Sequence, residues 1–488
     1  MNRRQFMIAT GGAAATGGTA AAAATRPNIL LLFPDQLRHD WVEPDSPFPV
    51  RTPNLKRLAA EGARFTMAVT PAPVCAPARA CLASGKEYDR CRVASNAVNY
   101  PLDQTTLYGL LRNSGYHVLG CGKFDLHKPE IDWGLDGKRL IREWGFSDGI
   151  DNEGKQDAIR SYEEAGKPTG PYMAYLERRG LAKVHVGDFR KRRGNATFPT
   201  PLPDDAYCDN WIARNGLDLL KSAPKNKPWF LQVNFNGPHA PWDVTANMQK
   251  GWRGVQFPQP NQGKGLTPDQ FNAVRQNYSA MVENIDRWVG VFLENLKQRG
   301  ESGSTLVAFA SDHGEMLGDH NAWGKSKPYQ PSVGVPLVCC GPGVKKGLAS
   351  KTPSTTMDLT ATFLDYAGVA VPPGMDSRSL RPYLEGKTDT GRDYVLSGLD
   401  SWRMVIQERY KFIRGFGSAP LLFDLLNDPL ENQNVAGAKP ALAARLTRLL
   451  ENRNPALAAR LNRLLENRGR STHSPFFPQP SGRATRMC

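Results

Sequence analysis

The chain has 488 residues, a formal net charge of +15 and 40% hydrophobic residues. This length exceeds the roughly 250 to 300 residues at which one hydrophobic core stops growing, which predicts two unequal domains. The composition is that of a folded globular protein. No stretch after residue 30 is long and apolar enough to span a bilayer, so we expect no stable membrane span.

The eight cysteines and the excess of basic residues restrict the function further. The cysteines form no CxxC pair and lack zinc-ligand spacing, which argues against a disulfide framework, although an isolated disulfide after export stays open. The basic runs are short and no nucleic-acid-binding signature accompanies them. Because a positive surface favours anionic partners, we expect an anionic substrate and no nucleic acid.

Residues 1–25 have the features of a bacterial export signal. Arg3 and Arg4 precede a weakly apolar segment of glycine and alanine, and the last alanines suit cleavage by a signal peptidase. The segment resembles a twin-arginine signal, which exports folded proteins. We therefore expect a periplasmic or extracellular protein, and the alternative is a flexible alanine-rich tail.

Apolar runs and amphipathic patterns alternate over residues 26–385. Buried strands are predicted within RPNILLLFPDQ, YHVLG, WFLQVNF and TLVAFAS. Helices are predicted in NLKRLAAEGARF, in TLYGLLRNSGY and in one long segment at 277–300. This alternation predicts an α/β fold with a large, mostly parallel sheet flanked by helices.

After residue 385 the predicted strands become shorter, which indicates a smaller C-terminal α+β subdomain over 386–470. It contains a duplication, PALAARLTRLLENRN at 440–454 and PALAARLNRLLENRG at 455–469. The first copy places Leu442, Leu446, Leu449 and Leu450 on one helical face. Two copies are too few for a solenoid, so we interpret them as a repeated terminal amphipathic helix. Residues 471–488 are expected to be a disordered tail.

Polar side chains follow the predicted strands, where ligands bind in parallel α/β folds. Asp35 and Gln36 follow the first strand, and Asp312 and His313 follow the strand at 305–311. Oxygen and imidazole donors of two such pairs suit one shared divalent cation. Each pair alone is more typical of a surface loop, and only their combination with the fold favours a metal site.

Other loops carry lysine and histidine. These residues are Lys123, Asp125 and His127 in GKFDLH, His239 in NGPHAPWD and Lys325 in HNAWGKSKPY. Loop lysines are usually exposed and inert, whereas lysines that converge on a metal site stabilise a developing anion.

The segment PVCAPARACLASGK at 73–86 contains the pattern Cys-x-Pro-x-Arg, followed by Leu-x-Ser-Gly. Its residues are Cys75, Pro77, Arg79, Leu82, Ser84 and Gly85. Together with PNILLLFPDQ, TLYGLLRNSGYHVLGCGK, the PHAP loop, MVENIDRWVG, SDHGEMLGDH and LFDLLNDPLENQNVA, in this order, the chain resembles the type I, formylglycine-dependent sulfatases of the alkaline phosphatase-like superfamily. The resemblance covers Arg26 to about residue 437 and implies a catalytic domain over 26–385.

The resemblance implies that a maturation enzyme oxidises Cys75 to formylglycine (3-oxoalanine). One hydroxyl of its hydrate attacks sulfur, and the other later expels sulfate. A single divalent cation, Ca²⁺ foremost and Mn²⁺ as the alternative, activates the nucleophile and binds the sulfate oxygens. The implied metal ligands are Asp35, Gln36, the modified Cys75, Asp312 and His313.

The remaining roles also come from the resemblance. Arg79 would hold the formylglycine, and Lys123 and Lys325 would bind and neutralise the sulfate. His239 would contact the substrate and protonate the leaving alcohol. Asn96, in the loop after the cysteine motif, is either a substrate contact or a polar loop residue.

Two positions depart from the family pattern. Many relatives have Gly-Lys-Trp-His where this chain has Gly-Lys-Phe-Asp, so Asp125 stands in place of the histidine that assists collapse of the hemiacetal. Either Asp125 acts as the base, His127 acts as the base instead, or turnover is slow. Gln36 and His313 stand where many sulfatases have Asp and Asn, which weakens the case for Ca²⁺ and favours a borderline ion such as Mn²⁺. The same pair occurs in relatives that hydrolyse phosphonate monoesters.

We therefore expect an exported sulfatase that acts on a sulfated carbohydrate, since the positive charge favours such a substrate over a small aryl ester. Two alternatives stay open. One is a phosphonate or phosphate ester hydrolase with the same nucleophile, and the other is a non-catalytic protein that binds sulfated glycans.

Overall fold

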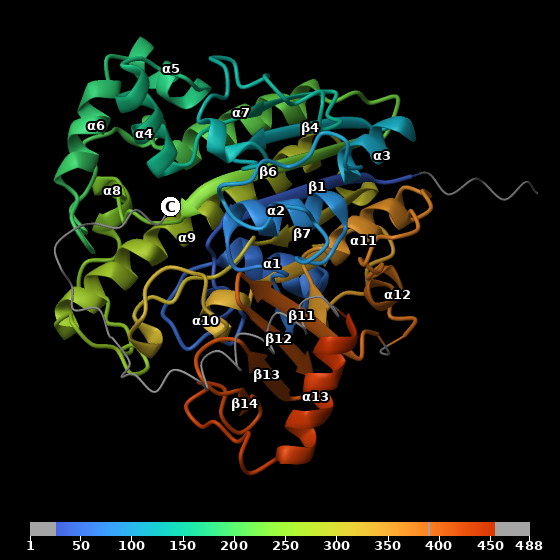
Figure 1. Cartoon of the computed structure of the whole chain (residues 1–488). Coiled ribbons are helices and arrows are strands. Elements are labelled where there is room, and N and C mark those ends of the chain that lie inside the picture. Colours follow the sequence, from blue (N-terminus) through green and yellow to red (C-terminus); the bar gives the residue numbers. More distant parts are fainter. Residues whose placement is uncertain (1–25, 389–390, 454–488) are drawn as a thin grey trace, which may run out of the picture.

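The computed structural model describes residues 26–388 and 391–453 (Figure 1). The predicted export signal at 1–25, the second copy of the duplication at 455–469 and the predicted tail at 471–488 lie outside the described residues. Within the described part, no helix combines the length and the apolar character needed to cross a membrane.

An eight-stranded sheet forms the centre of the larger domain, in the order β5-β4-β6-β1-β7-β8-β2-β9. Its strands are β1 (Asn28–Asp35), β2 (Ala63–Phe65), β4 (His117–Gly122), β5 (Asp148–Asp151), β6 (Trp229–Pro238), β7 (Thr305–Ala310), β8 (Leu337–Cys340) and β9 (Leu348–Ser350). Strand β8 is antiparallel to β7 and β2, and the other neighbours are parallel. This confirms the predicted mostly parallel sheet. The short strands β3 (Ala68–Val69) and β10 (Ser354–Thr355) pair separately.

Helices cover both faces of the sheet (Figure 1). Because side chains alternate along a strand, Leu30 and Leu32 of β1 enter one core and Ile29 and Leu31 the other. The first core includes α1 (Pro53–Glu61), α4 (Lys155–Ala165), α5 (Pro171–Arg178), α6 (Ala182–Lys191), α7 (Cys208–Ser222) and α9 (Pro268–Gln298). The second includes α2 (Cys75–Ser84), α3 (Leu107–Asn113), α11 (Asp358–Tyr366) and α12 (Arg381–Leu384). Two short helices, α8 (Ala246–Lys250) and α10 (Gln330–Val333), complete the domain.

The long helix α9 begins earlier than its apolar pattern predicts, at Pro268 rather than at residue 277. The reason is a capping box, in which the Thr267 side chain accepts from the backbone NH of Gln270 and the Gln270 side chain accepts from that of Thr267. The predicted apolar face is confirmed, because Met281, Ile285, Val289, Phe292 and Leu296 are all buried.

The C-terminal subdomain is a four-stranded antiparallel sheet with one helix. Its elements are β11 (Tyr394–Leu399), β12 (Trp402–Gln407), β13 (Tyr410–Arg414), β14 (Leu421–Asp424) and α13 (Pro440–Arg453). Helix α13 lies within the first copy of the duplication, and its Leu446 and Leu450 pack on Val405, Phe412 and Leu422. The opposite face of the sheet packs on Val69 and Val333 of the larger domain. The predicted α+β subdomain is thereby confirmed.

The contact between α13 and the sheet generates a stability prediction. Leu446→Ala removes a fully buried side chain and should lower the free energy of unfolding by about 2 to 4 kcal/mol. The matched variant Leu442→Ala truncates a half-buried leucine of the same helix and should cost less. Thermal unfolding of both variants checks this, and equal losses would contradict the packing described.

Candidate active site

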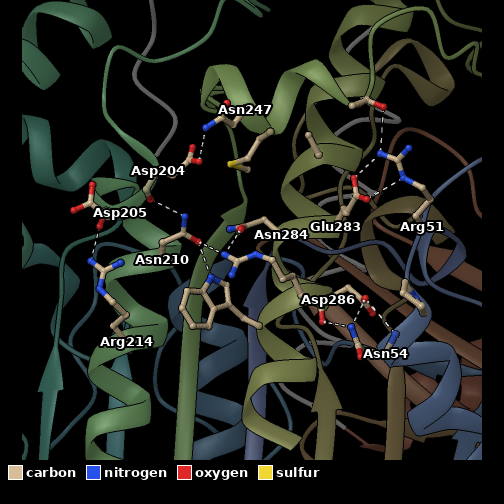
Figure 2. Close-up of a pocket in the computed structure, with 16 residues that line it drawn as sticks. Arg51, Asn54, Asp204, Asp205, Asn210, Arg214, Asn247, Glu283, Asn284 and Asp286 are labelled. Carbon is tan, nitrogen blue, oxygen red and sulfur yellow. Dashed lines mark hydrogen bonds and ion pairs between the residues drawn. The ribbon is translucent and has the colours of Figure 1, made fainter. Parts of the chain in front are cut away.

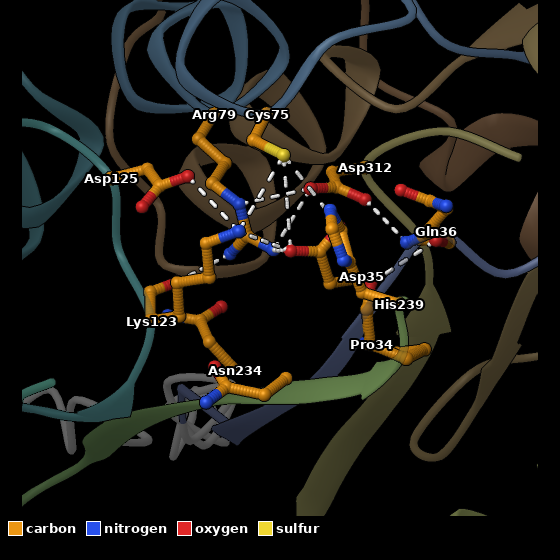
Figure 3. Close-up of polar contacts among 12 residues, drawn as sticks. Pro34, Asp35, Gln36, Cys75, Arg79, Lys123, Asp125, Asn234, His239 and Asp312 are labelled. Carbon is orange, nitrogen blue, oxygen red and sulfur yellow. Dashed lines mark hydrogen bonds and ion pairs between the residues drawn. The ribbon is translucent and has the colours of Figure 1, made fainter. Parts of the chain in front are cut away.

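Four adjacent strands deliver side chains to one edge of the sheet. Asp35 ends β1, Lys123 follows β4, His239 follows β6 and Asp312 follows β7. Cys75 joins them as the first residue of α2 (Figure 3). Residues up to 277 positions apart in sequence therefore meet because the carboxyl ends of parallel strands lie at one edge.

A glycine allows the close approach that places Lys123. Gly122, at the end of β4, has a φ of 106°, and a Cβ atom there would lie 1.9 Å from the carbonyl oxygen of Asn234 in β6. Only glycine fits this left-handed position beside another backbone. The backbone NH of Lys123 donates to the same Asn234 carbonyl, so its side chain starts from a fixed point beside Asp35 (Figure 3).

The centre of the site is a buried group of two carboxylates, one imidazole and one thiol. One donor atom from each of Asp35, Cys75, Asp312 and His313 lies within 4.8 Å of the others, and all four residues are buried. The Cys75 Sγ lies 3.4 Å from His313 Nε2 and 3.7 Å from Asp35 Oδ1. This donor set suits a divalent cation.

The ammonium groups of two lysines lie close to Cys75 Sγ. Lys325 Nζ lies 3.0 Å and Lys123 Nζ 3.5 Å from Cys75 Sγ. Burial and the charge of Asp35 raise the pKa of the Cys75 thiol, but Lys123, Lys325 and His313 outweigh them and bring it to about 6. The position therefore stabilises a negative charge on the side chain of residue 75.

Helix α2 fixes the position of residue 75. Pro77 lies in its first turn, where no helical NH is required. Asn96 Oδ1 accepts from the backbone NH of Ala76 at 3.0 Å and so caps the helix from the following loop. The position of this oxygen favours a role of Asn96 in holding the N-terminus of α2.

Arg79 lies one turn after Cys75 and holds two other parts of the site in place. Its Nε and Nη2 lie 3.0 and 2.9 Å from Asp312 Oδ2, and its Nη1 donates to the carbonyl of Lys123. Arg79 thus fixes one carboxylate and the backbone that carries Lys123. Arg79 therefore helps to position residue 75 only indirectly, because both residues belong to α2.

The two candidates for the hemiacetal base differ in their surroundings. Asp125 Oδ2 lies 3.2 Å from both Lys123 Nζ and Lys128 Nζ. Burial raises the pKa of Asp125, but Lys123, Lys128 and Arg79 lower it well below its usual value. Such a carboxylate is a weak base. Its contacts favour a role in orienting Lys123.

His127 is directed elsewhere. Its Nε2 bonds the Asp132 carbonyl at 2.9 Å, and its Nδ1 lies 3.4 Å from Asp151 Oδ2. Burial lowers the pKa of His127, so the imidazole is held neutral against these partners. These contacts do not bring it to Cys75, which argues against its replacing the missing histidine.

His239 and Lys325 form the outer side of the site. His239 Nε2 lies 2.8 Å from Lys325 Nζ, and both residues are half-buried. Burial first, and Lys325 second, lower the pKa of His239 well below its usual value. The neutral imidazole therefore accepts a hydrogen bond from the Lys325 ammonium, and the pair is able to pass a proton toward a bound group.

Glu315, a residue that no sequence pattern singled out, orients the side chain of Gln36. The Gln36 Nε2 donates to Glu315 Oε2, while Glu315 Oε1 accepts from the backbone NH groups of Leu317 and Gly324. With its amide nitrogen engaged, Gln36 turns Oε1 toward Lys325 Nζ, at 2.9 Å. The only sequence signal was the position of Glu315 two residues after His313.

A cavity separate from the group around Cys75 lies between α1, α7, α8 and α9 (Figure 2). Its volume is about 870 Å³, and its charged groups bond one another: Arg51 pairs with Glu283, and Asp286 accepts from Asn54. The residues that line it include none of the group around Cys75.

The mostly parallel sheet with its flanking helices and small C-terminal antiparallel sheet is an alkaline phosphatase-like fold. Residues 27–369 match the family model described as sulfatase, and residues 318–455 match the model of the C-terminal region of N-sulphoglucosamine sulphohydrolase. The chain belongs to the sulfatase family and is a sulfuric ester hydrolase.

Several known proteins are similar to this chain. An arylsulfatase of Clostridium perfringens is 26% identical over 85% of this chain and 91% of its own length. An N-acetylglucosamine-6-O-sulfatase of Bacteroides thetaiotaomicron is 26% identical over 76% of this chain and 73% of its own. The crystal structure of a phosphonate monoester hydrolase of Agrobacterium radiobacter has a TM-score of 0.73 at 24% identity, over 89% of this chain and 96% of that one.

The bond between Gln36 and Glu315 generates a prediction about metal binding. Glu315→Gln can donate as well as accept, so the Gln36 amide loses its fixed orientation, and affinity for Mn²⁺ or Ca²⁺ should fall by about 10- to 100-fold. The control is Glu283→Gln, in α9 and outside the site. Titration calorimetry checks this, and unchanged affinity in Glu315→Gln would contradict the assigned role.

Proposed function

We propose that this enzyme hydrolyses sulfate esters of a carbohydrate with a formylglycine made from Cys75 and one divalent cation. The observation that carries the proposal is the position of Cys75 Sγ, 3.0 Å and 3.5 Å from two lysine ammonium groups and within 4.8 Å of three metal-donor residues. The similarity to an N-acetylglucosamine sulfatase supports a carbohydrate substrate.

The charges of the site support the cation. Burial and the nearby charge of Asp35 raise the pKa of Asp312, because two buried carboxylates repel each other. Asp35, Gln36, Asp312 and His313 would hold a divalent cation, whose charge would offset this repulsion. When bound, the cation lowers the pKa of a hydroxyl on residue 75 and binds sulfate oxygens. Mn²⁺ and Ca²⁺ both suit this mixed oxygen and nitrogen set.

The residues around the cation position have separable roles. Lys123 and Lys325 provide positive charge beside residue 75, where the negative charge of the sulfate collects. Lys325 Nζ donates to His239 Nε2 at 2.8 Å, so the Lys325 ammonium is the source of the proton that His239 Nε2 relays to the oxygen of the departing alcohol. Asp125 holds Lys123 in place.

An aldehyde at residue 75 allows the enzyme to release the sulfate that becomes bound to this side chain, so that no stable sulfated enzyme accumulates. A hydrated aldehyde carries two hydroxyls. One forms the bond to sulfur as the alcohol leaves, and the other passes its proton to the pair of Lys325 and His239, which has given one to the alcohol, as the carbon–oxygen bond to sulfate breaks. This chemistry requires a maturation enzyme as partner. The twin-arginine-like segment supports export, so we place the mature enzyme in the periplasm or outside the cell.

The proposal predicts a difference between two cysteines of the same helix. Cys75→Ala should lower the turnover of 4-nitrophenyl sulfate by at least about 1,000-fold, because no nucleophile remains. Cys81→Ala, also buried in α2 but without a contact to the metal donors, should stay active. Steady-state kinetics and circular dichroism check this. A folded, active Cys75→Ala enzyme would refute the nucleophile.

A second candidate, phosphonate monoester hydrolysis, is favoured by the pair Gln36 and His313 and by the similarity to the Agrobacterium enzyme. Turnover of matched nitrophenyl sulfate and phosphonate monoesters separates the two. We expect the larger kcat/KM for sulfate, and a clear preference for the phosphonate would reverse the order of the candidates. Membership of a family of hydrolases, with the nucleophile position retained, argues against the non-catalytic glycan-binding alternative.

A further inference from the structure

A second cavity lies beside the N-terminus of α2, next to Cys75, and is large enough for the alcohol part of a substrate. Its volume is about 770 Å³, and it is lined by Val74 and Ser326, the chain neighbours of Cys75 and Lys325. The loop 88–97 forms one wall, and the turn 399–403 of the C-terminal subdomain forms the other. We call it the alcohol pocket. Cavities of roughly 300 to 1,000 Å³ bind drug-sized ligands, so a saccharide fits better than a small alcohol.

The two walls are tied to each other. The backbone NH of Asp400 donates to Tyr88 Oη at 3.1 Å, and Arg403 Nε lies 2.9 Å from Asp89 Oδ2. Trp402 Nε1 donates to the carbonyl of Ser326 at 3.3 Å. The pocket is therefore a built feature in which the C-terminal subdomain is fixed against the loop that carries Lys325.

The two arginines of the alcohol pocket differ in how firmly they are engaged. The Arg403 side chain is 10% exposed, bonds the carboxylate of Asp89 and lies 4.7 Å from the centre of the Tyr88 ring. It also donates to the carbonyls of Asp400 and Trp402. Arg403 is thus part of the wall. It also covers the Tyr88 ring, which removes an aromatic surface that a cationic alcohol would use.

Arg92 makes fewer contacts than Arg403, and they are more exposed. Its side chain is 52% exposed and pairs with Asp103, which is itself 71% exposed, at 2.9 and 3.1 Å. An exposed ion pair of this kind contributes about 0 to 1 kcal/mol. An anionic group of a bound ligand can therefore replace Asp103 at little cost, whereas Asp89 is already neutralised by Arg403.

We propose that Arg92 binds a second anionic group, a sulfate or a carboxylate, on the saccharide whose sulfate ester is cleaved at residue 75. This inference rests on the proposed function and adds a substrate class, the polyanionic saccharides.

The test compares pairs of substrates that differ in one charge. Sulfate release is measured from a monosulfated aminosugar, from the same sugar with a second sulfate, and from a sulfated disaccharide that contains a uronate. Arg92→Ala should lower kcat/KM for the doubly charged sugars by about 10- to 100-fold, mainly through KM, since a hydrogen bond to a charged group is lost. The monosulfated sugar should change less than about twofold. The two doubly charged sugars distinguish sulfate from carboxylate recognition.

Two further variants keep the test decisive. Asp103→Asn frees Arg92 from its partner and should raise kcat/KM for the doubly charged sugars, the opposite direction from Arg92→Ala. Arg178→Ala removes one exposed charge from α5, away from the pocket, and should leave all substrates unchanged. Equal losses on singly and doubly charged sugars in Arg92→Ala, or no effect of either variant at position 92 or 103, would overturn the inference.

The outcome also separates this inference from the proposed function. Release of sulfate from 4-nitrophenyl sulfate by the unaltered enzyme, together with no charge preference at Arg92, contradicts only the role of Arg92. Failure to release sulfate from every ester, the aryl ester included, contradicts the proposed function itself.

Discussion

The balance of buried charge around Asp35 is the constraint on which the rest of the site depends. Two carboxylates, Asp35 and Asp312, lie among the cations of Arg79, Lys123 and Lys325, and burying any of these charges alone would cost several kcal/mol. Burial raises the pKa of Asp35, but Lys123 first, and then Lys325 and Arg79, lower it well below the usual value. Each of these buried charges therefore depends on the others for its stability. Together they place net positive charge around Cys75.

The fold supplies this balance through its topology. Four neighbouring parallel strands end at one edge, and α2 points its first residue at the same place. Contacts made outside the central group then fix its members: Arg79 holds Asp312, Asp125 holds Lys123, Glu315 holds Gln36, and Asn96 caps the helix that carries Cys75. A site assembled in this way is rigid before a substrate arrives, which is what stabilisation of a developing charge requires.

The sequence was sufficient for the parts of this arrangement that depend on local pattern. The buried strands, the helical leucines of residues 440–454 and the polar residues at strand ends all follow from hydrophobic periodicity, and the cysteine motif identified the family. The start of α9 was missed because the capping box at Thr267 lies before the apolar pattern begins. Glu315, Lys128 and the pairing of Arg403 with Asp89 could not be predicted, because each depends on a contact between segments that only the folded chain brings together. The sequence left open whether Asp125 or His127 is the hemiacetal base or turnover is slow, and the two lysines beside Asp125 favour a role in orienting Lys123, which the sequence did not suggest.

The central claim is that residue 75 of the active enzyme is an aldehyde and not a thiol. Mass spectrometry of the peptide that spans residues 71–86, taken from enzyme produced in a host with the maturation system, tests it most directly. The account predicts that the thiol of Cys75 is replaced by an aldehyde, in a proportion that rises with specific activity, while Cys81 in the same peptide stays a thiol. Fully active enzyme with an unmodified thiol at residue 75 would contradict it.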